Sequence, residues 1–203
     1  MKIGPKYKIA KRLGASVFEK TQTQKFALSE ARKQKTRGRR PRALSDYGKQ
    51  LIEKQKVRFT YGITESQFRK YVKQAMGSVD HNPAAKLHEL LERRLDNVAY
   101  RLTLATTRRA ARQMVSHGHI TVNGKKITVP SHQVRVGDVI GVRDGSKSAV
   151  LFEQAGARMT ESTIAAWLKP DPKSLQGEVT DVPAFIETDA AGDLAAVISF
   201  YSR

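Results

Sequence analysis

Apolar residues recur at helical spacing through the first half of the chain. Ser45 is a favourable N-cap residue and predicts a helix over residues 46–57. Thr64 and Gln67 have the spacing of a capping box, and the apolar positions that follow them predict an amphipathic helix that ends at Gly77. The strongest repeat comes next, where apolar residues at 87, 91, 95, 98 and 102 form one stripe and predict a single helix.

The periodicity changes from helical to alternating after one further helix. Thr106 or Thr107 is expected to cap that helix, and Gly118 is expected to end it in a left-handed conformation. Apolar and polar residues then alternate, and Asn123-Gly124 is typical of a two-residue hairpin turn. Two helices followed by a hairpin indicate a compact helix-and-sheet module.

The remaining pattern indicates more strands and a less regular tail. Apolar residues between 134 and 142 predict strands, residues 162–168 predict a short helix or a turn, and alternation from Leu194 to Phe200 predicts a strand. The expected fold class is α+β, a mostly helical N-terminal body plus a compact module of two helices and a small antiparallel sheet. The expected segments are a basic, largely extended arm (1–42), a helical body (43–87), the module (88–150) and an acidic segment that packs back on the body (151–203).

Charge is distributed unevenly along the chain. Its 203 residues hold 37 Lys and Arg against 19 Asp and Glu, a net charge of +18. Residues 1–80 carry +15, residues 81–150 carry +7, and residues 151–203 carry −4. Such an excess favours a polyanionic partner, either nucleic acid or an anionic membrane, over a merely solvated basic surface. Residues 1–42 lack the apolar stripe of a membrane-surface helix, so nucleic acid is favoured and no membrane contact is expected.

Several classes of function are excluded by composition. The chain has no cysteine, which excludes disulfides, a cysteine nucleophile and any cysteine-based zinc site. It has neither an apolar run of transmembrane length nor a secretory signal at its N-terminus, so we expect a cytoplasmic protein. His117 and His119 form a pair without a third ligand at suitable spacing, and we expect no metal, no cofactor and no catalytic site.

Basic residues cluster in two places that suit RNA. The run from residue 32 to residue 42 has no apolar residue, so alone in water it should be disordered and become ordered on phosphates. The helices and hairpin of residues 90–125 are expected to display arginine, histidine and asparagine outside their apolar core, and arginine suits phosphates because its planar fork donates to two oxygens. The candidate RNA-binding residues are Lys6, Lys8, Lys11, Arg12, Arg37, Arg39, Arg40, Arg42, Tyr47, Lys54, Lys56, Arg58, Arg69, Arg93, Arg94, Asn97, Arg101, Arg108, Arg109, Arg112, His117, His119, Asn123, Lys125 and Lys126.

Specific segments of the sequence resemble a known family. LLERRLDNVAYRL, TRRAARQMVSHGHITVNGKK and VRVGDVI resemble the RNA-binding module named after small-subunit ribosomal protein S-four. That module also occurs in pseudouridine synthases, some tRNA synthetases and heat-shock proteins. The flanking segments GPKYKIAKRLG, LSDYGKQLIEKQKVRFTYGITESQFRKYV and VISFYSR resemble the bacterial ribosomal S-four family itself.

The resemblance implies a structural role in the small ribosomal subunit. Members bind a helix junction in the 5′ domain of 16S rRNA and start subunit assembly. They line the path by which mRNA enters, beside the S-three and S-five types of protein, and influence decoding accuracy. No enzymatic activity and no homo-oligomer are expected. An RNA-modifying enzyme and a free RNA chaperone, each built on the same module, are the alternatives.

The sequence departs from the usual pattern of this family near the N-terminus. Many bacterial relatives hold a zinc ion there with cysteines, whereas Tyr7 and Ala10 occupy the positions of the first pair in this chain. The chain therefore resembles a cysteine-free, zinc-less form. Packing or RNA contact must order the segment in place of the metal.

Overall fold

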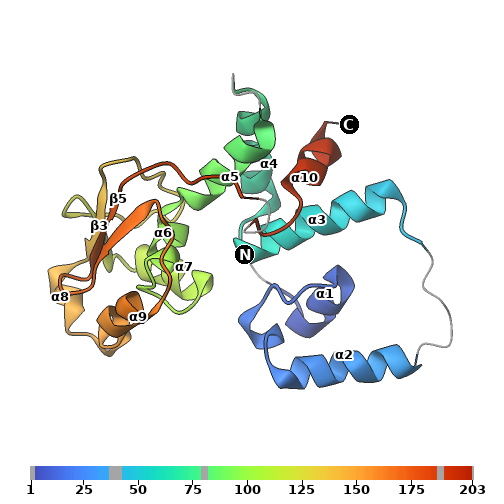
Figure 1. Cartoon of the computed structure of the whole chain (residues 1–203), viewed down its shortest axis with the longest axis horizontal. Helices are drawn as coiled ribbons and strands as arrows, with labels where there is room; N and C mark the ends of the chain where they lie inside the picture. The colour runs from blue at the N-terminus through green and yellow to red at the C-terminus, as the bar shows by residue number, and fades with distance from the viewer. Residues whose placement is uncertain (1–2, 37–42, 79–81, 187–189, 203) are drawn as a thin grey trace. The chain divides into compact units, whose positions relative to one another are not determined.

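The computed structural model describes residues 3–36, 43–78, 82–186 and 190–202 (Figure 1). The chain divides into two compact units. The helical unit consists of Met1–Ala84 together with Ile186–Arg203, and the mixed unit consists of Ala85–Phe185. The α+β class expected from the sequence is confirmed, because helices make up the described part of the first unit and a small antiparallel sheet lies in the second.

The helical unit is built from short helices with clear capping signals. Its elements are α1 (Lys6–Leu13), the 3-10 turn η1 (Glu19–Thr21), α2 (Gln24–Thr36), α3 (Asp46–Thr60), α4 (Glu65–Met76) and α10 (Leu194–Tyr201). The two predicted caps are confirmed. The Ser45 hydroxyl accepts a hydrogen bond from the Gly48 amide, and the Thr64 hydroxyl accepts one from the Gln67 amide.

Residues 6–36 fold into helices where we expected a largely extended arm. Phe18 and Phe26 are buried and form a small apolar cluster with Ala10. The Tyr7 ring lies 5.3 Å from that of Phe26, centroid to centroid. This aromatic packing explains why the segment is helical despite its charge, since burial of the rings offsets the ordering entropy. Most of the cations in the basic run, at positions 37–42, lie outside the described residues.

The predicted strand near the C-terminus is wrong, because that segment is helix α10. Asp193 caps it by accepting a hydrogen bond from the Ala196 amide. The helix packs along α3, with Leu194 and Val197 buried. The segment is short and apolar at every position except Ser199, so its pattern fits a buried helix as well as a strand.

The mixed unit places helices against one small sheet. Its elements are α5 (Pro83–Glu92), α6 (Leu95–Arg101), α7 (Arg108–Ser116), β1 (Ile120–Val122), β2 (Lys125–Lys126), β3 (Val139–Val142), α8 (Asp144–Lys147), the 3-10 turn η2 (Val150–Phe152), α9 (Ala155–Glu161), β4 (Leu168–Asp171) and β5 (Gln176–Val179). The strand order is β2-β1-β3-β5-β4, and the pairs are antiparallel. The predicted hairpin is confirmed, with φ of 50° at Asn123 and 75° at Gly124.

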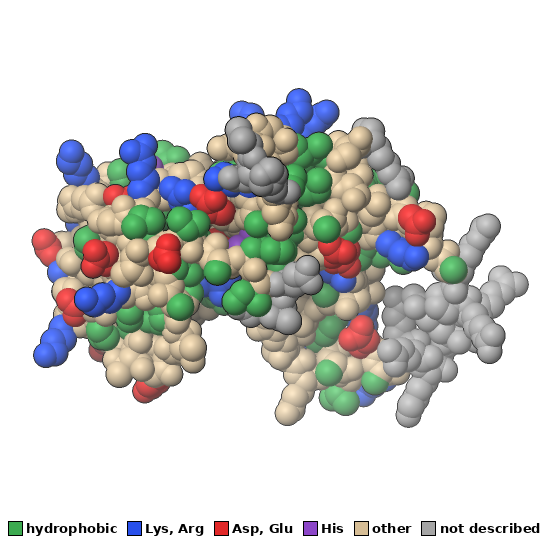
Figure 2. Space-filling model, turned by 45° about the horizontal axis from the view of Figure 1, so that its top comes forward, with side chains coloured by type: hydrophobic (Ala, Val, Ile, Leu, Met, Phe, Trp, Pro, Cys, Tyr) green, Lys and Arg blue, Asp and Glu red, His purple; other side chains and the backbone are tan. Residues whose placement is uncertain are grey.

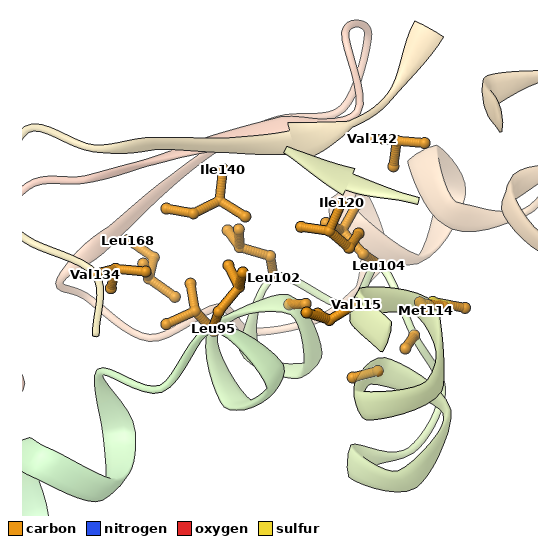
Figure 3. Packing of buried hydrophobic residues seen from close by; sticks show 14 of the residues in the cluster. Leu95, Leu102, Leu104, Met114, Val115, Ile120, Val134, Ile140, Val142 and Leu168 are labelled. Atoms are coloured by element: carbon orange, nitrogen blue, oxygen red, sulfur yellow. The ribbon is translucent and has the colours of Figure 1, made fainter. Parts of the chain in front are cut away.

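The core of the mixed unit lies between the sheet and helices α6 and α7. Figure 3 shows Leu95 and Leu102 facing Ile140, and Val115 facing Ile120. The approach of helix and sheet is close, since a Cβ at Gly177 of β5 would lie 2.3 Å from a methyl carbon of Leu102. This packing gives the polar side of α6 and α7 a rigid support.

The single helix predicted through residues 87–102 is interrupted. Helix α5 ends at Glu92 and α6 begins at Leu95, with Arg94 in an extended conformation between them. The loop over residues 130–134 supplies the replacement hydrogen bonds, because the Leu95 amide donates to the His132 carbonyl and the Val134 amide donates to the Arg93 carbonyl. The helix therefore ends because it contacts a segment that is distant in the sequence, since Arg93 and Val134 are 41 residues apart.

Candidate nucleic-acid interface

Arg108 opens helix α7 and is held in place by α6. The Thr107 hydroxyl caps the helix by accepting a hydrogen bond from the Ala110 amide at 3.0 Å. The Arg108 Nε donates to the Asn97 Oδ1 at 2.8 Å, and its guanidinium lies 4.5 Å from the centre of the Tyr100 ring. Arg108 is therefore oriented before any ligand arrives.

Buried Glu92 connects α5 to this arrangement. Its carboxylate accepts two hydrogen bonds from Arg101, from Nε at 2.8 Å and from Nη2 at 3.1 Å. The Asn97 Nδ2 donates to the Glu92 carbonyl at 3.1 Å, which fixes the amide that holds Arg108. Arg101 and Asn97 thus serve to position their neighbours, and only Arg101 keeps part of its side chain at the surface.

The expectation that Arg94 and Asn97 face outward is wrong. Arg94 is completely buried and Asn97 is 2% exposed. The Arg94 guanidinium donates from Nε and Nη2 to the two carboxylate oxygens of Asp96, at 3.0 and 2.6 Å. This bidentate pair neutralises the arginine inside the unit, so the buried charge has its partner there.

Arg93 lies at the surface but is also engaged. It pairs with Glu89, and its Nε donates to the Val134 carbonyl at 2.8 Å. Burial opposes ionisation of Glu89, yet hydrogen bonds from Lys86 and Arg93 outweigh it and lower the pKa of that carboxyl. Arg93 consequently holds the loop that follows the hairpin against α5.

The hairpin brings its lysines to the end of α7. Gly118, with φ of 75°, ends the helix as predicted, and a Cβ there would lie 2.2 Å from the Lys126 Cε. The Lys126 stem therefore crosses directly over Gly118. Lys125, Lys126, His117 and, on α7, Arg109 are exposed. The two hairpin lysines thus lie near the C-terminal end of α7, whereas Arg109 lies in its first turn.

Two predicted contact residues of the hairpin region have internal partners. The Asn123 side chain donates to Asp138 and accepts from the Val139 amide, both at 2.8 Å, so it closes the turn. The His119 Nδ1 lies 3.0 Å from the Ser146 hydroxyl, and its ring contacts that of Phe152. Both residues shape the hairpin that carries the lysines.

In the helical unit, Lys54 is buried, contrary to its expected place at the surface. Its ammonium donates to Glu65 at 2.8 Å and lies 4.8 Å from the centre of the Phe200 ring. Burial tends to raise the pKa of Glu65, but hydrogen bonds from Lys54 and Tyr201 outweigh it and lower the pKa. Burial and the hydrogen bond to Glu65 raise the pKa of Tyr201. Lys54 therefore anchors α10 to α3 and α4.

The other candidates of the helical unit differ in how firmly they are held. Lys11 donates to the Ser29 carbonyl and hydroxyl, Lys56 pairs with Glu53 at 2.6 Å, and Arg58 lies 3.5 Å from Glu65. Lys6 is partly buried, and its ammonium lies 5.7 Å from the centre of the Phe18 ring. The exposed candidates are Lys8, Arg12, Tyr47 and Arg69. Arg37, Arg39, Arg40 and Arg42 lie outside the described residues.

Two arginines that the sequence did not single out lie near the candidate surface of the mixed unit. Arg143 is exposed, and its amide donates to the His119 carbonyl at 2.8 Å, which places it beside the hairpin. Arg158 of α9 donates to the carbonyls of Thr103 and Leu104, at 3.3 and 3.4 Å, and holds the connection between α6 and α7. The position of Arg143 follows from the pairing of the strands and that of Arg158 from the packing of α9, so neither was evident from the sequence.

The face drawn in Figure 2 carries both signs of charge. Figure 2 shows Lys and Arg side chains interspersed with Asp and Glu on the visible face. Over the part of the chain that the structure describes, no group of three or more His, Asp or Glu is placed to hold a metal ion. None of the helices described is both long enough and apolar enough to cross a bilayer.

Comparison with known proteins covers nearly the whole chain. Residues 1–92 match the family described as "Ribosomal protein S4/S9 N-terminal domain", and residues 93–140 match the family described as "S4 domain". The protein named "Small ribosomal subunit protein uS4" of Roseiflexus castenholzii is 43% identical over 99% of this chain and 98% of its own length. Proteins of the same name from Sulfurihydrogenibium and Limosilactobacillus reuteri are each 41% identical, over 98% of both chains.

Proposed function

Because this chain belongs to the small ribosomal subunit protein uS4 family, we propose that it is a structural, non-enzymatic constituent of the small ribosomal subunit that binds 16S rRNA. In this proposal it acts on the ribosome in the cytoplasm. It binds a helix junction in the 5′ domain of the rRNA as a primary binder and nucleates assembly of the subunit.

The observation that carries this proposal is that basic side chains of α7 and of the hairpin are held in place within the folded mixed unit. Arg108 is fixed by Asn97, and Lys126 crosses Gly118, so cations are held on a helix and a hairpin that share one core. Folded RNA is recognised largely by shape and by phosphate and 2′-hydroxyl contacts, which suits such a rigid surface. Arg109, Arg112 and Lys125 are the residues of this surface that we propose contact phosphates.

The same proposal includes further roles that the family resemblance suggests. We propose that the protein lies at the path by which mRNA enters, next to proteins of the S-three and S-five types, and that it contributes to translational accuracy. The cations of the helical unit, among them Lys8, Arg12 and Arg69, supply additional rRNA contacts there.

Binding of the intact protein to a 5′-domain fragment of 16S rRNA tests the central claim. The double variant Arg109→Ala with Lys125→Ala removes two exposed cations without disturbing the internal network. If both contact phosphates, the slope of log affinity against log salt should become shallower by about 1.5.

Lys169→Ala is the matched control for that experiment. Lys169 is an exposed lysine on β4, at the opposite edge of the sheet from the hairpin. Its loss should leave the salt slope unchanged. Equal slopes for the double variant and the wild type would show that these cations do not contact phosphate, and no binding by the wild type would refute the proposed function.

A further inference from the structure

The hairpin turn of the mixed unit contains an asparagine that can lose its side-chain amide. Asn123 precedes Gly124, and both residues are exposed. Because glycine lacks a side chain, its backbone nitrogen can reach the side chain of the preceding asparagine without steric hindrance. The other two asparagines of the chain are poorly suited to this reaction. Asn82 precedes a proline, which has no N–H, and Asn97 precedes Val98, whose amide is hydrogen-bonded in the backbone.

We propose that Asn123 is a site of spontaneous deamidation, that the closed hairpin suppresses the reaction, and that the deamidated chain binds rRNA less tightly. The last part rests on the proposed function, because it assumes that the hairpin contacts rRNA. The first two parts concern the chemistry of the chain alone.

The reaction needs only water as a co-reactant. The Gly124 nitrogen loses its proton to solvent and attacks Cγ of Asn123, while the bond from Cγ to Nδ2 breaks and Nδ2 takes up a proton and leaves as ammonia. The product is a cyclic succinimide. Water then opens the ring at either of its carbonyls, which gives aspartate or isoaspartate, the latter with an extra methylene in the backbone. The net change replaces a neutral amide with a carboxylate.

The folded hairpin holds both polar atoms of the Asn123 side chain. Its Nδ2 donates to the Asp138 Oδ1 and its Oδ1 accepts from the Val139 amide, each at 2.8 Å. The Asn123 backbone amide also donates to the Val139 carbonyl, at 2.8 Å. Ring closure brings Cγ within bonding distance of the Gly124 nitrogen and expels Nδ2, so the side chain must leave these partners. A hydrogen bond to a charged group such as Asp138 is among the stronger ones, and it therefore slows the reaction.

The product places two carboxylates against each other. Asp138 is held in place, because its second oxygen accepts a hydrogen bond from the Arg135 amide at 2.7 Å. An aspartate at position 123 would still accept from the Val139 amide, but its other oxygen would face the Asp138 Oδ1 without a proton between them. Like charges in contact repel and oppose closure of the turn. The turn leads directly into β2, so the two lysines of that strand lose their fixed position.

Peptide mass spectrometry of the intact protein aged in alkaline buffer tests the first two parts. Deamidation at Asn123 should be about thirtyfold slower, or more, in the folded protein than in the same chain unfolded by guanidinium chloride, since both side-chain hydrogen bonds must break. Asp138→Ala should speed the reaction in the folded protein about tenfold, because the charged acceptor is gone. Asp144→Ala is the matched control, since this exposed aspartate of the same unit pairs with Lys147 instead, and the rate should not change. Equal rates in the folded and unfolded wild type would overturn the suppression, and no reaction in the unfolded chain would overturn the site.

Binding of the 5′-domain rRNA fragment to Asn123→Asp tests the effect of the product. Affinity should fall about tenfold, because a charge-assisted hydrogen bond is replaced by repulsion. Asn123→Asp with Asp138→Asn exchanges the two groups. The amide at position 138 then donates to the carboxylate at position 123, and its oxygen still accepts from the Arg135 amide, so affinity should recover.

Asn123→Asp with Glu153→Gln is the matched control for that exchange. Glu153 is an exposed carboxylate of the same unit, so this double variant has the same net charge as the wild type. The carboxylates at positions 123 and 138 still face each other in it, and its affinity should remain low.

The outcomes separate this inference from the proposed function. If the wild type and Asn123→Asp bind rRNA equally well, the effect on binding is wrong while the proposed function stands. If both double variants recover affinity, net charge explains the loss, and the argument from facing carboxylates is wrong. If the wild type binds no rRNA, the proposed function fails and the effect on binding fails with it, whereas the ageing experiment still decides whether Asn123 is a deamidation site.

Discussion

Replacing Asp96 with asparagine removes the partner charge of the buried Arg94 guanidinium. Arg94 has no exposed surface, and the side chain of Asp96 is only 6% exposed, so water cannot compensate for the lost carboxylate. Breaking a buried ion pair by removing one partner costs about 3–5 kcal/mol. In a unit of this size each kcal/mol lowers the melting temperature by about 4 °C or more, which gives a fall of at least about 12 °C.

Thermal unfolding followed by circular dichroism measures this effect on the transition of the mixed unit. Asp144→Asn is the matched control, because Asp144 also pairs with a cation, Lys147 at 2.8 Å, but its side chain is 95% exposed. That variant should melt with the wild type, since exposed pairs contribute little. The double variant Arg94→Met with Asp96→Leu should recover most of the loss, because an apolar pair carries no unpaired charge.

Equal melting temperatures for Asp96→Asn, Asp144→Asn and the wild type would refute this reasoning. They would mean that Arg94 finds another partner or reaches solvent when Asp96 is neutral. Arg94 lies between α5 and α6, and its neighbours Arg93 and Leu95 make the hydrogen bonds to the loop over residues 130–134. A movement of Arg94 toward solvent should therefore also break those hydrogen bonds.

Two further predictions concern pH and the hairpin. The pKa of Glu65 is lowered from its ordinary value of 4.5, so the stability that Glu65 contributes through Lys54 is present at neutral pH and is lost as the pH falls below 4.5. Urea titrations at several pH values should show that Glu65→Gln abolishes this part of the acid sensitivity. Gly118→Ala and Gly124→Ala each place a side chain at positive φ and should cost about 1–2 kcal/mol. Only Gly118→Ala displaces Lys126, so it alone should also weaken rRNA binding, and equal affinities would contradict the role of that lysine.

Signals that act within a few residues were predicted well from the sequence. Ser45, Thr64 and Thr107 cap helices as expected, and Gly118 ends one with positive φ. The turn at Asn123 also has the predicted geometry. Each of these outcomes depends on the chemistry of one side chain and the backbone next to it, and a single sequence is enough to predict such local effects.

Features that depend on distant contacts were not predictable in the same way. The stripe from Leu87 to Leu102 is continuous, and only the approach of residues 130–134 breaks the helix within it. Arg94 and Lys54 were expected at the surface as RNA-binding residues, and lysine and arginine side chains usually lie there. Their burial depends on Asp96 and Glu65, partners whose selection follows from the folded chain and not from spacing alone.

The placement of α10 has a consequence for the order of folding during synthesis. The mixed unit is one continuous stretch, Ala85–Phe185, and can be complete while the last residues are still within the ribosome that makes them. The helical unit needs Ile186–Arg203 to pack against α3. Although most of this unit is synthesised first, its folding is therefore completed last. A chain that stops before Leu194 would carry an intact mixed unit beside an incomplete helical unit, and so display an uncovered apolar face of α3 to chaperones and proteases.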